Sequence, residues 1–213
     1  VRVGDAVICM APGCHATGVT CPESDLFAMP QRLTFEEACA LPAVAITMID
    51  AFKKADPQPG ERILIQTAAG GTGLIAVQLA QHAGATVIAT AGSQHKLEYL
   101  ERMGVSERIN YRETDFEAEV MRITDGTGVD VVINTLAGEA MAKGLNCLAP
   151  GGRYIEIAMA ALKSALAVDL SVLSDNQAFF AIDIGRLHQG NPARLKMLRA
   201  EMVRLAEAGV ISP

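Results

Sequence analysis

The sequence predicts an α/β protein in which a smaller β-rich segment precedes a Rossmann-like, doubly wound parallel sheet. Three observations predict this class. From residue 62 onwards, short runs rich in valine and isoleucine alternate with amphipathic runs, which is typical of a parallel sheet covered on both faces. A small-residue, glycine-rich turn joins the first strand of that series to the first helix. Residues 1–30 lack the alternation, so we expect a different module there.

The segment before the parallel sheet is expected to contain short strands and then helices. Residues 34–37, Thr-Phe-Glu-Glu, fit a capping box and predict a helix start. Pro42 is expected to open a second helix that runs to Lys54. Residues 56–60, Asp-Pro-Gln-Pro-Gly, predict a turn before the first parallel strand. The short strands expected before these helices are 6–8 and 26–28.

The remaining elements continue the alternation of strand and helix. Gly104 is expected to end one of the helices in a left-handed conformation. A short helix is expected near Gly185. The predicted strands are 62–66, 86–90, 108–110, 129–134 and 153–157, and the predicted longer helices are 72–83, 94–103, 116–124, 139–148 and 192–208.

The turn after the first parallel strand carries the strongest functional signal. Ala68, Gly70 and Gly73 occupy the positions of a G-x-G-x-x-G fingerprint between a strand and a helix. Small residues there let the backbone approach a pyrophosphate, and the free N–H groups at the helix start bind the anion. The sequence therefore predicts a dinucleotide site, and an ordinary strand–helix turn is the alternative.

The end of the next strand indicates which dinucleotide. An acidic residue usually follows that strand in NAD-binding folds and bonds the ribose hydroxyls. Here the strand runs into Gly92, Ser93 and Lys96, and no acid appears before Glu98. A hydroxyl and an ammonium attract a 2′-phosphate, so the sequence favours NADP over NAD. In the alternative interpretation Ser93 only caps the helix and Lys96 is solvated, and both can hold at once.

Composition narrows the function classes. The 213 residues are 50% hydrophobic and 20% charged with a net charge of −6, which gives no reason to expect nucleic acid or an anionic membrane as a partner. No apolar run reaches the length of a membrane span and no signal-peptide pattern is present, so we expect a cytoplasmic protein. No metal site is expected, because the cysteines lack metal-ligand spacing. These cysteines are Cys9, Cys14, Cys21, Cys39 and Cys147.

Several stretches resemble the medium-chain dehydrogenase/reductase superfamily. They are residues 3–7, 41–42, 60–65 and 68–73. Two further stretches, Asn-Thr-Leu-Ala-Gly-Glu at 134–139 and Pro-Gly-Gly-Arg-Tyr-Ile-Glu at 150–156, are similar to the "NSLAGE" and "GGRFVE" stretches of enoylreductase domains in polyketide and fatty acid synthases. The resemblance covers nearly all of the chain. The ligand patterns of the zinc-dependent branch are not found, which agrees with a zinc-free reductase.

The resemblance implies a division into two domains. Residues 1–30 would be the C-terminal part of a GroES-like substrate domain, and residues 31–213 would be the Rossmann-like NADP-binding domain. We expect both to be truncated, because the chain starts on mid-domain strand sequence and stops after a helix that should lead into another strand.

The resemblance also implies an activity. It is NADPH-dependent reduction of an α,β-unsaturated thioester on an acyl carrier protein, with hydride transfer to the β-carbon and protonation of the α-carbon. Neighbouring synthase domains would be partners, and some zinc-free relatives are homodimers. The alternatives are a free-standing zinc-free quinone or enoyl reductase, a reductase-derived domain that closes a ring by displacing a leaving group, and a non-catalytic scaffold domain.

Motif positions in the family imply roles for individual residues. The expected pyrophosphate-binding residues are Ala69, Gly70, Gly71, Thr72 and Gly73. Those expected around the 2′-phosphate are Gly92, Ser93, Lys96 and Tyr111. Those expected beside the nicotinamide and its ribose are Thr47, Asn134, Leu136, Ala137, Ile157 and Ala158.

The catalytic residues are where the sequence departs from the family. Relatives often read "LTAYYAL" where this chain has residues 46–52, and both tyrosines, one a candidate proton donor, are replaced by Ile49 and Asp50. Asp50 lies in an otherwise apolar helix and is expected at its solvent edge. The catalytic candidates are then Lys163, the nearest lysine after the "YIE" strand, and Asp183, which matches an aspartate of the family's "FDL" stretch. The alternatives are a solvated lysine and, for Asp183, a helix cap or a surface ion pair.

Overall fold

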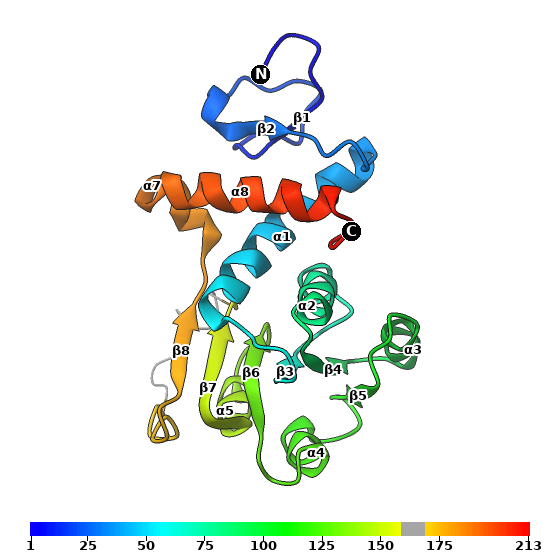
Figure 1. Cartoon of the computed structure of the whole chain (residues 1–213), viewed down its shortest axis with the longest axis vertical. Helices are drawn as coiled ribbons and strands as arrows, with labels where there is room; N and C mark the ends of the chain where they lie inside the picture. The colour runs from blue at the N-terminus through cyan, green and yellow to red at the C-terminus, as the bar shows by residue number, and fades with distance from the viewer. Residues whose placement is uncertain (159–168) are drawn as a thin grey trace.

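The structure is a computed structural model that describes residues 1–158 and 169–213. Its main body is a six-stranded parallel sheet with the strand order β5-β4-β3-β6-β7-β8 (Figure 1). A separate antiparallel pair, β1 (Val7–Cys9) and β2 (Leu26–Ala28), lies at the far end of the molecule beyond α8. The prediction of a Rossmann-like sheet preceded by a small β-rich segment is confirmed.

The six parallel strands all direct their carboxyl ends towards the same edge of the sheet. Successive residues of a strand point to opposite faces of the sheet, and each face has its own hydrophobic core. Ile63 and Ile65 belong to one core, and Leu64 belongs to the other. Both faces are therefore apolar, as the β-branched strand sequences predict. The strands are β3 (Arg62–Ile65), β4 (Thr86–Ala91), β5 (Glu107–Asn110), β6 (Val129–Asn134), β7 (Leu148–Glu156) and β8 (Ala178–Ala181).

The helices cover the two faces unequally. One core lies between the sheet and α1 (Phe35–Ala55), α2 (Gly71–His82), α3 (Gln94–Arg102) and α8 (Pro192–Glu207). The other core lies beneath α4 (Phe116–Ile123) and α5 (Glu139–Asn146). The described residues also include three short helices, which are the 3-10 helices η1 (Glu23–Asp25) and η2 (Ile184–Arg186) and the one-turn helix α7 (Leu187–Gly190).

Helix α1 corrects one expectation. The capping box forms as predicted, since the Thr34 hydroxyl accepts from the Glu37 N–H at 3.2 Å and the Glu37 carboxylate accepts from the Thr34 N–H at 2.8 Å. However, Pro42 does not open a second helix and lies inside one continuous helix. Leu41 and Pro42 are both buried there, so core packing outweighs the backbone hydrogen bond that proline cannot donate.

Strands β7 and β8 also differ from the sequence-based prediction. Strand β7 begins at Leu148, so the expected turn at 150–152 lies inside the strand, where the pairing with β6 shifts register. Strand β8 was not predicted from the sequence. It pairs with β7 in parallel, and the Phe179 ring stacks on Tyr154 with centroids 5.3 Å apart. A four-residue edge strand that depends on such a contact carries little local sequence signal.

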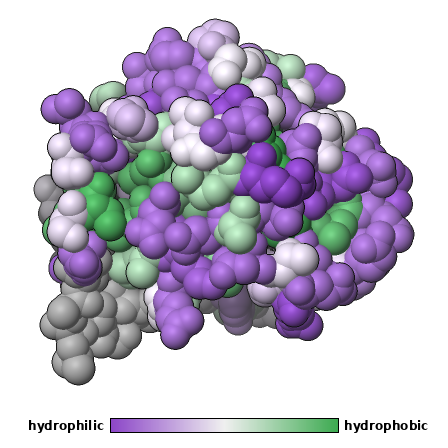
Figure 2. Space-filling view, turned by 90° about the horizontal axis from the view of Figure 1, so that it is seen from below, coloured by the Kyte–Doolittle hydropathy of each residue, from purple (hydrophilic) through white to green (hydrophobic). Residues whose placement is uncertain are grey.

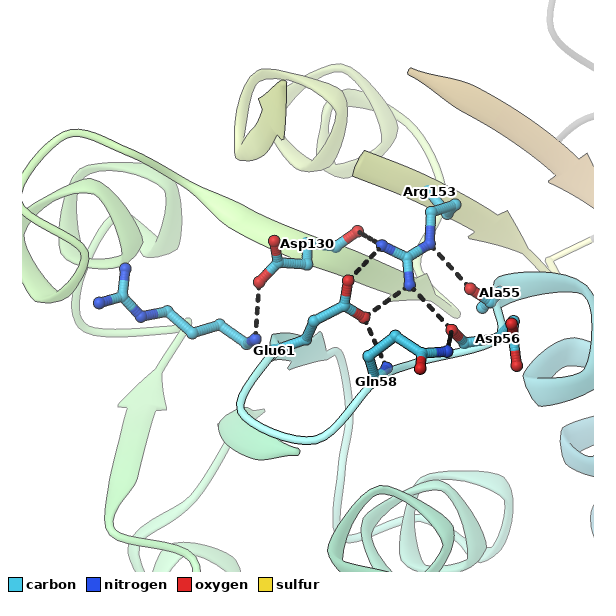
Figure 3. A network of polar contacts seen from close by, with 7 residues as sticks. Ala55, Asp56, Gln58, Glu61, Asp130 and Arg153 are labelled. Carbon is cyan, nitrogen blue, oxygen red and sulfur yellow. Dashed lines mark hydrogen bonds and ion pairs between the residues drawn. The ribbon is translucent and has the colours of Figure 1, made fainter. Parts of the chain in front are cut away.

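Arg153 joins α1, β3 and β7 at the amino ends of the strands (Figure 3). Its guanidinium makes two hydrogen bonds to the Glu61 carboxylate, at 2.6 and 2.9 Å, and donates to the Ala55 carbonyl at 2.8 Å. The carbonyls of Ala55, the last residue of α1, and of its C-cap residue Asp56 are thereby satisfied. The Arg153 guanidinium, as the largest cause, holds the pKa of Glu61 below its usual value.

The β1–β2 segment is attached to the main body through α8. The Arg199 guanidinium lies 5.5 Å from the centroid of the Phe27 ring, 3.8 Å from the Asp25 carboxylate, and donates to the Ser24 carbonyl. These contacts combine a buried ion pair with a cation–π interaction. They hold the β1–β2 pair against α8, which lies between this pair and the carboxyl edge of the sheet (Figure 1).

The opposite end of the molecule carries α4 and the loops that enter the strands (Figure 1). Polar residues cover most of the face seen from below, with hydrophobic residues in smaller groups between them (Figure 2). Among the residues that the structure describes, no helix combines the length and the apolar character that crossing a membrane would require.

Candidate cofactor site

The fingerprint turn packs as tightly as its residue pattern predicts. Gly73 is buried in the first turn of α2, and a Cβ there would lie 2.6 Å from the Ala68 Cα and from the carbonyl oxygens of Ala68 and Thr67. Only glycine fits this contact between helix and turn, which is the role of the third glycine in a dinucleotide fingerprint. Gly70 and Gly71 are exposed at the same helix start, so the backbone there is open to a ligand.

Thr67, the second residue after β3, has a strained backbone conformation. Thr67 has φ of +48°, which is a rare conformation for a β-branched residue and is found mostly at functional sites. Its hydroxyl shares a short hydrogen bond with the Thr135 hydroxyl, and its N–H donates to the Thr90 hydroxyl at 3.2 Å. The turn after β3 is thus tied to the ends of both neighbouring strands.

The start of α2 offers unpaired N–H groups. Gly70 is the N-cap residue and supplies no capping side chain, and the first turn contains no acid. Helix α1 passes beside it, with Val44 Cγ1 3.5 Å from the Cβ position of Gly71. Thr47 lies one turn further along α1, and its hydroxyl donates to the Ala43 carbonyl at 2.7 Å, leaving the oxygen as an acceptor. This arrangement can bind the anionic pyrophosphate of a dinucleotide.

The carboxyl end of β4 forms a basic corner. Ser93 is the N-cap residue of α3, but its side chain makes no capping bond and instead lies 3.2 Å from His95 Nδ1, so the interpretation of Ser93 as a plain cap is not supported. Lys96 is exposed in the first turn of α3, which has no acid. Tyr111 and Arg112 follow β5 and cover Gly92, whose Cβ position lies 2.7 Å from the Tyr111 hydroxyl and 3.0 Å from Arg112 Nε.

Arg112 is a site residue that the sequence reasoning missed. It follows Tyr111, which motif position in the family had selected, just after the end of β5. Strands β4 and β5 are adjacent and parallel, so the residues that follow them lie at the same edge of the sheet. A basic residue shortly after β5 was therefore the sequence signal that could have identified Arg112. The corner therefore holds two cations and two hydroxyl groups, a set suited to a phosphate.

The ends of β6 and β7 form the other half of the site. The buried Asn134 amide donates to the Glu156 carboxylate at 2.6 Å and to the Leu136 carbonyl at 2.8 Å. The second carboxylate oxygen of Glu156 accepts from the Ala158 N–H at 2.6 Å. Burial raises the pKa of Glu156, although the hydrogen bonds it accepts act in the opposite direction. The expected nicotinamide-side residues that follow β6 and β7 thus lie at one edge, whereas Thr47 belongs to α1. Ala137 is exposed, and Ile157 and Ala158 are half-buried.

The two catalytic candidates have different outcomes. Lys163 lies outside the described residues. Asp183 follows β8 at the carboxyl edge, next to the Ile182 N–H that donates to the Glu156 carbonyl at 2.9 Å. Its carboxylate lies 3.4 Å from Arg186 Nε, so it takes part in the expected surface ion pair. A cavity of about 610 Å³ between residues 10–12 and Ile184–Gly185 begins beside it, and its catalytic role stays a prediction.

Asp50 is not at the solvent edge of its helix, as the sequence predicted. It is 2% exposed, and its Oδ1 accepts from Nε of Arg194, while Nη2 of the same guanidinium is also 2.6 Å from Oδ1. Lys54 lies 3.6 Å from the other carboxylate oxygen. The expectation was wrong because the partner is supplied by α8, 144 residues away in sequence. Asp50 and the buried Ile49 therefore do not replace the missing tyrosine hydroxyl.

Three thiols converge in the N-terminal segment. The sulfurs of Cys9 and Cys21 are 3.4 Å apart, and those of Cys9 and Cys14 are 3.5 Å apart. Burial and the neighbouring thiols raise the pKa of Cys9 to about 12, so it is a neutral thiol at physiological pH. Within residues 1–158 and 169–213, no group of three or more His, Cys, Asp or Glu side chains is arranged to hold a metal ion.

The residues present fit a dinucleotide. The close packing at Gly73 and the start of α2, which has no side-chain cap and no acid in its first turn, suit a pyrophosphate. The basic residues around the end of β4 and the acid-free first turn of α3 suit a further phosphate. The basic corner at β4 and the residues that follow β6 and β7 lie at the carboxyl ends of strands on either side of β3, and ligands of open α/β sheets bind across this edge.

Comparison with known proteins agrees with this geometry. The family model described as zinc-binding dehydrogenase matches residues 71–197. The chain is 35% identical, over its whole length, to a highly reducing polyketide synthase of Purpureocillium lilacinum, of which it spans 9%.

Two solved structures are similar as well. The CurF ER cyclopropanase of the curacin A biosynthetic pathway matches with a TM-score of 0.87 and 36% identity, over 100% of this chain and 64% of that one. The nucleotide-binding subdomain of the enoylreductase domain of PpsC from Mycobacterium tuberculosis matches with a TM-score of 0.73 and 37% identity, over 79% of this chain and 94% of that one. The chain therefore belongs to the medium-chain dehydrogenase/reductase family, whose matching model carries the description zinc-binding dehydrogenase. Within this family it is related to the enoylreductase domains of polyketide synthases.

Proposed function

We propose that this chain is the cofactor-binding part of an NADPH-dependent enoylreductase domain in a polyketide synthase. Its substrate is an α,β-unsaturated thioester on an acyl carrier protein. The observation that supports the cofactor most strongly is the basic corner at the end of β4, where Tyr111 and Arg112 cover Gly92. Ser93 and Lys96 follow at the start of α3, whose first turn has no acid. The relationship to enoylreductase domains supports the reaction.

In this proposal each part of the site has its own role. When bound, NADPH supplies the hydride that reduces the β-carbon of the enoyl thioester. The uncapped start of α2 holds the pyrophosphate, and the corner at β4 holds the 2′-phosphate. The segments after β6 and β7 position the nicotinamide half. Protonation of the α-carbon is assigned to Lys163, to Asp183 or to water.

The rest of the domain and its partners are part of the same proposal. Residues 1–30 are the end of a GroES-like substrate domain, whose other strands complete the substrate pocket above the carboxyl edge. Residues 31–213 are the cofactor domain. The acyl carrier protein and the neighbouring synthase domains are the partners, because the chain spans only about a tenth of the curated relative it matches over its whole length.

A second candidate function is supported by a specific observation. Both tyrosine positions of the "LTAYYAL" stretch are lost, and the structure shows Ile49 in the core and Asp50 engaged with Arg194. A domain without a proton donor is suited to let the α-carbanion attack a carbon that bears a leaving group, which closes a ring. The similarity to CurF, described as an ER cyclopropanase, supports this alternative.

One experiment tests the cofactor. The binding of NADPH and of NADH is measured by calorimetry on the intact protein and on the variants Lys96→Ala and Arg112→Ala. Each variant is expected to weaken NADPH about tenfold, which corresponds to one charge-assisted hydrogen bond at an exposed site, and to leave NADH unchanged. Equal affinities of the unaltered protein for the two cofactors would contradict the proposed phosphate corner.

The reaction is then tested with two thioesters, a plain enoyl thioester and one with a halogen on the γ-carbon. A saturated product from the first, and from the second a saturated product that keeps the halogen, support enoyl reduction. Release of halide with formation of a cyclic product from the second shows ring closure and would replace the leading proposal.

A further inference from the structure

A row of buried polar side chains crosses the sheet just before its carboxyl edge. Thr90, Gln66, Asn134 and Glu156 come from four adjacent strands or strand ends and lie at equivalent positions in the register. All four have 0% exposure. They lie on the face covered by α4 and α5, because the residue two places before each of them belongs to that core. A carboxylate in such a row is costly unless its hydrogen bonds serve the fold or the site.

The carboxylate of Glu156 connects two separate segments. Its Oε2 accepts from the Asn134 amide and its Oε1 accepts from the Ala158 N–H, both at 2.6 Å. Asn134 in turn holds the backbone of Leu136 from both sides, donating to its carbonyl at 2.8 Å and accepting from its N–H at 3.1 Å. The segment after β6 and the segment after β7 are therefore fixed to each other through one buried side chain.

We propose that Glu156 is a positioning residue for the nicotinamide half of the cofactor. It acts without touching the cofactor, by holding residues 134–137 and 157–158 at a fixed separation through Asn134 and Ala158. The inference rests on the proposed function, which places the nicotinamide and its ribose against these two segments. It assigns a role to a residue that motif position had left without one.

The geometry predicts that only one half of the cofactor depends on this tether. The basic corner for the adenosine phosphate lies at the end of β4, whereas Glu156 ends β7, and β3 and β6 lie between them. The corner is built from α3 and from the residues after β5, and among the described residues Glu156 makes no hydrogen bond to either. Loss of the tether should weaken NADPH and leave its adenosine fragment, 2′,5′-ADP, bound as before.

The test exchanges the carboxylate and the amide between the two positions. Glu156→Gln places an amide donor against the Asn134 amide, and Asn134→Asp places a carboxylate against the Glu156 carboxylate, so each single variant breaks the tether. In the double variant N134D/E156Q the introduced amide donates to the introduced carboxylate and its oxygen still accepts from the Ala158 N–H. The contact between positions 134 and 156 is restored with reversed polarity, whereas the hydrogen bond to the Leu136 carbonyl stays lost, because a carboxylate cannot donate. Rescue of the restored contact distinguishes a specific interaction from general damage.

Calorimetry with NADPH and with 2′,5′-ADP gives the readout on the intact protein. Each single variant is expected to weaken NADPH about tenfold, a typical consequence of losing a buried charge-assisted hydrogen bond, while 2′,5′-ADP binds as before. The double variant is expected to bind NADPH more tightly than Asn134→Asp, with only partial recovery because both lack the hydrogen bond to the Leu136 carbonyl. The matched control is Tyr154→Phe, on the same strand and face and fully buried, whose hydroxyl has no hydrogen-bond partner among the described residues. It should bind both ligands as the unaltered protein does.

The outcomes are separable. Single variants that bind NADPH normally, or a double variant that binds it no better than Asn134→Asp, would overturn the tether. Equal losses for NADPH and 2′,5′-ADP would show general structural damage and would overturn it as well. An unaltered protein that binds neither ligand would instead refute the proposed function on which the tether rests.

Discussion

Replacing Gly73 by alanine tests the contact between α2 and the fingerprint turn. The new Cβ would lie 2.6 Å from three backbone atoms of Thr67 and Ala68, and no side-chain rotation can relieve a backbone contact. The helix or the turn must move by about 0.8 Å to reach 3.4 Å, where ordinary contacts begin. Overpacking of this severity costs about 3 kcal/mol, and alanine returns about 1 kcal/mol of helix propensity, so the free energy of unfolding should fall by about 2 kcal/mol.

The same helix turn supplies the matched control. A Cβ at Gly71 would meet Val44 Cγ1 at 3.5 Å, an ordinary contact, so Gly71→Ala should be as stable as the unaltered protein or gain up to about 1 kcal/mol. Urea unfolding followed by circular dichroism measures all three proteins under one condition. If Gly73→Ala proved as stable as Gly71→Ala, the account of the third glycine as a packing requirement would be wrong.

Two further predictions concern ion pairs away from the site. Arg153 holds the pKa of Glu61 below its usual 4.5, so the pair stabilises the fold above that pH and the contribution is lost as pH falls through the lowered pKa. The unfolding free energy of Glu61→Gln should therefore lie about 1–2 kcal/mol below that of the unaltered protein at neutral pH, and the gap should close in acid; a gap independent of pH would contradict the assignment. Arg194→Met should destabilise by about 3 kcal/mol and Asp50→Asn by less, because the Asp50 side chain is 3% exposed and the Arg194 side chain 37% exposed. Thermal melts that rank the two variants in the opposite order would refute this reasoning.

The parts of the fold that depend on local pattern could be predicted from the sequence. Strand β6 has the expected bounds, because its β-branched run is uninterrupted and ends at a polar residue. The fingerprint turn and the capping box at Thr34 also form as expected, since each needs only residues within one turn of the chain. The positions of the site elements then follow, because parallel strands bring their carboxyl ends to one edge.

The remaining features depend on contacts between distant residues. Strand β8 is held by pairing and by the stack of Phe179 on Tyr154, and α1 continues through Pro42 because its surroundings bury it. Asp50 is buried because α8 brings Arg194 to it. The tether at Glu156 required the register of β6 and β7, which no periodicity in the sequence reveals.

The measurement that tests the central claim most directly is turnover by the intact protein. A short enoyl thioester on an acyl carrier protein is incubated with NADPH, and in parallel with NADH, and the acyl product is identified by mass spectrometry. The account predicts a saturated thioester, formed with NADPH and not with NADH. Tight NADPH binding without any saturated product would contradict the assignment as an enoylreductase.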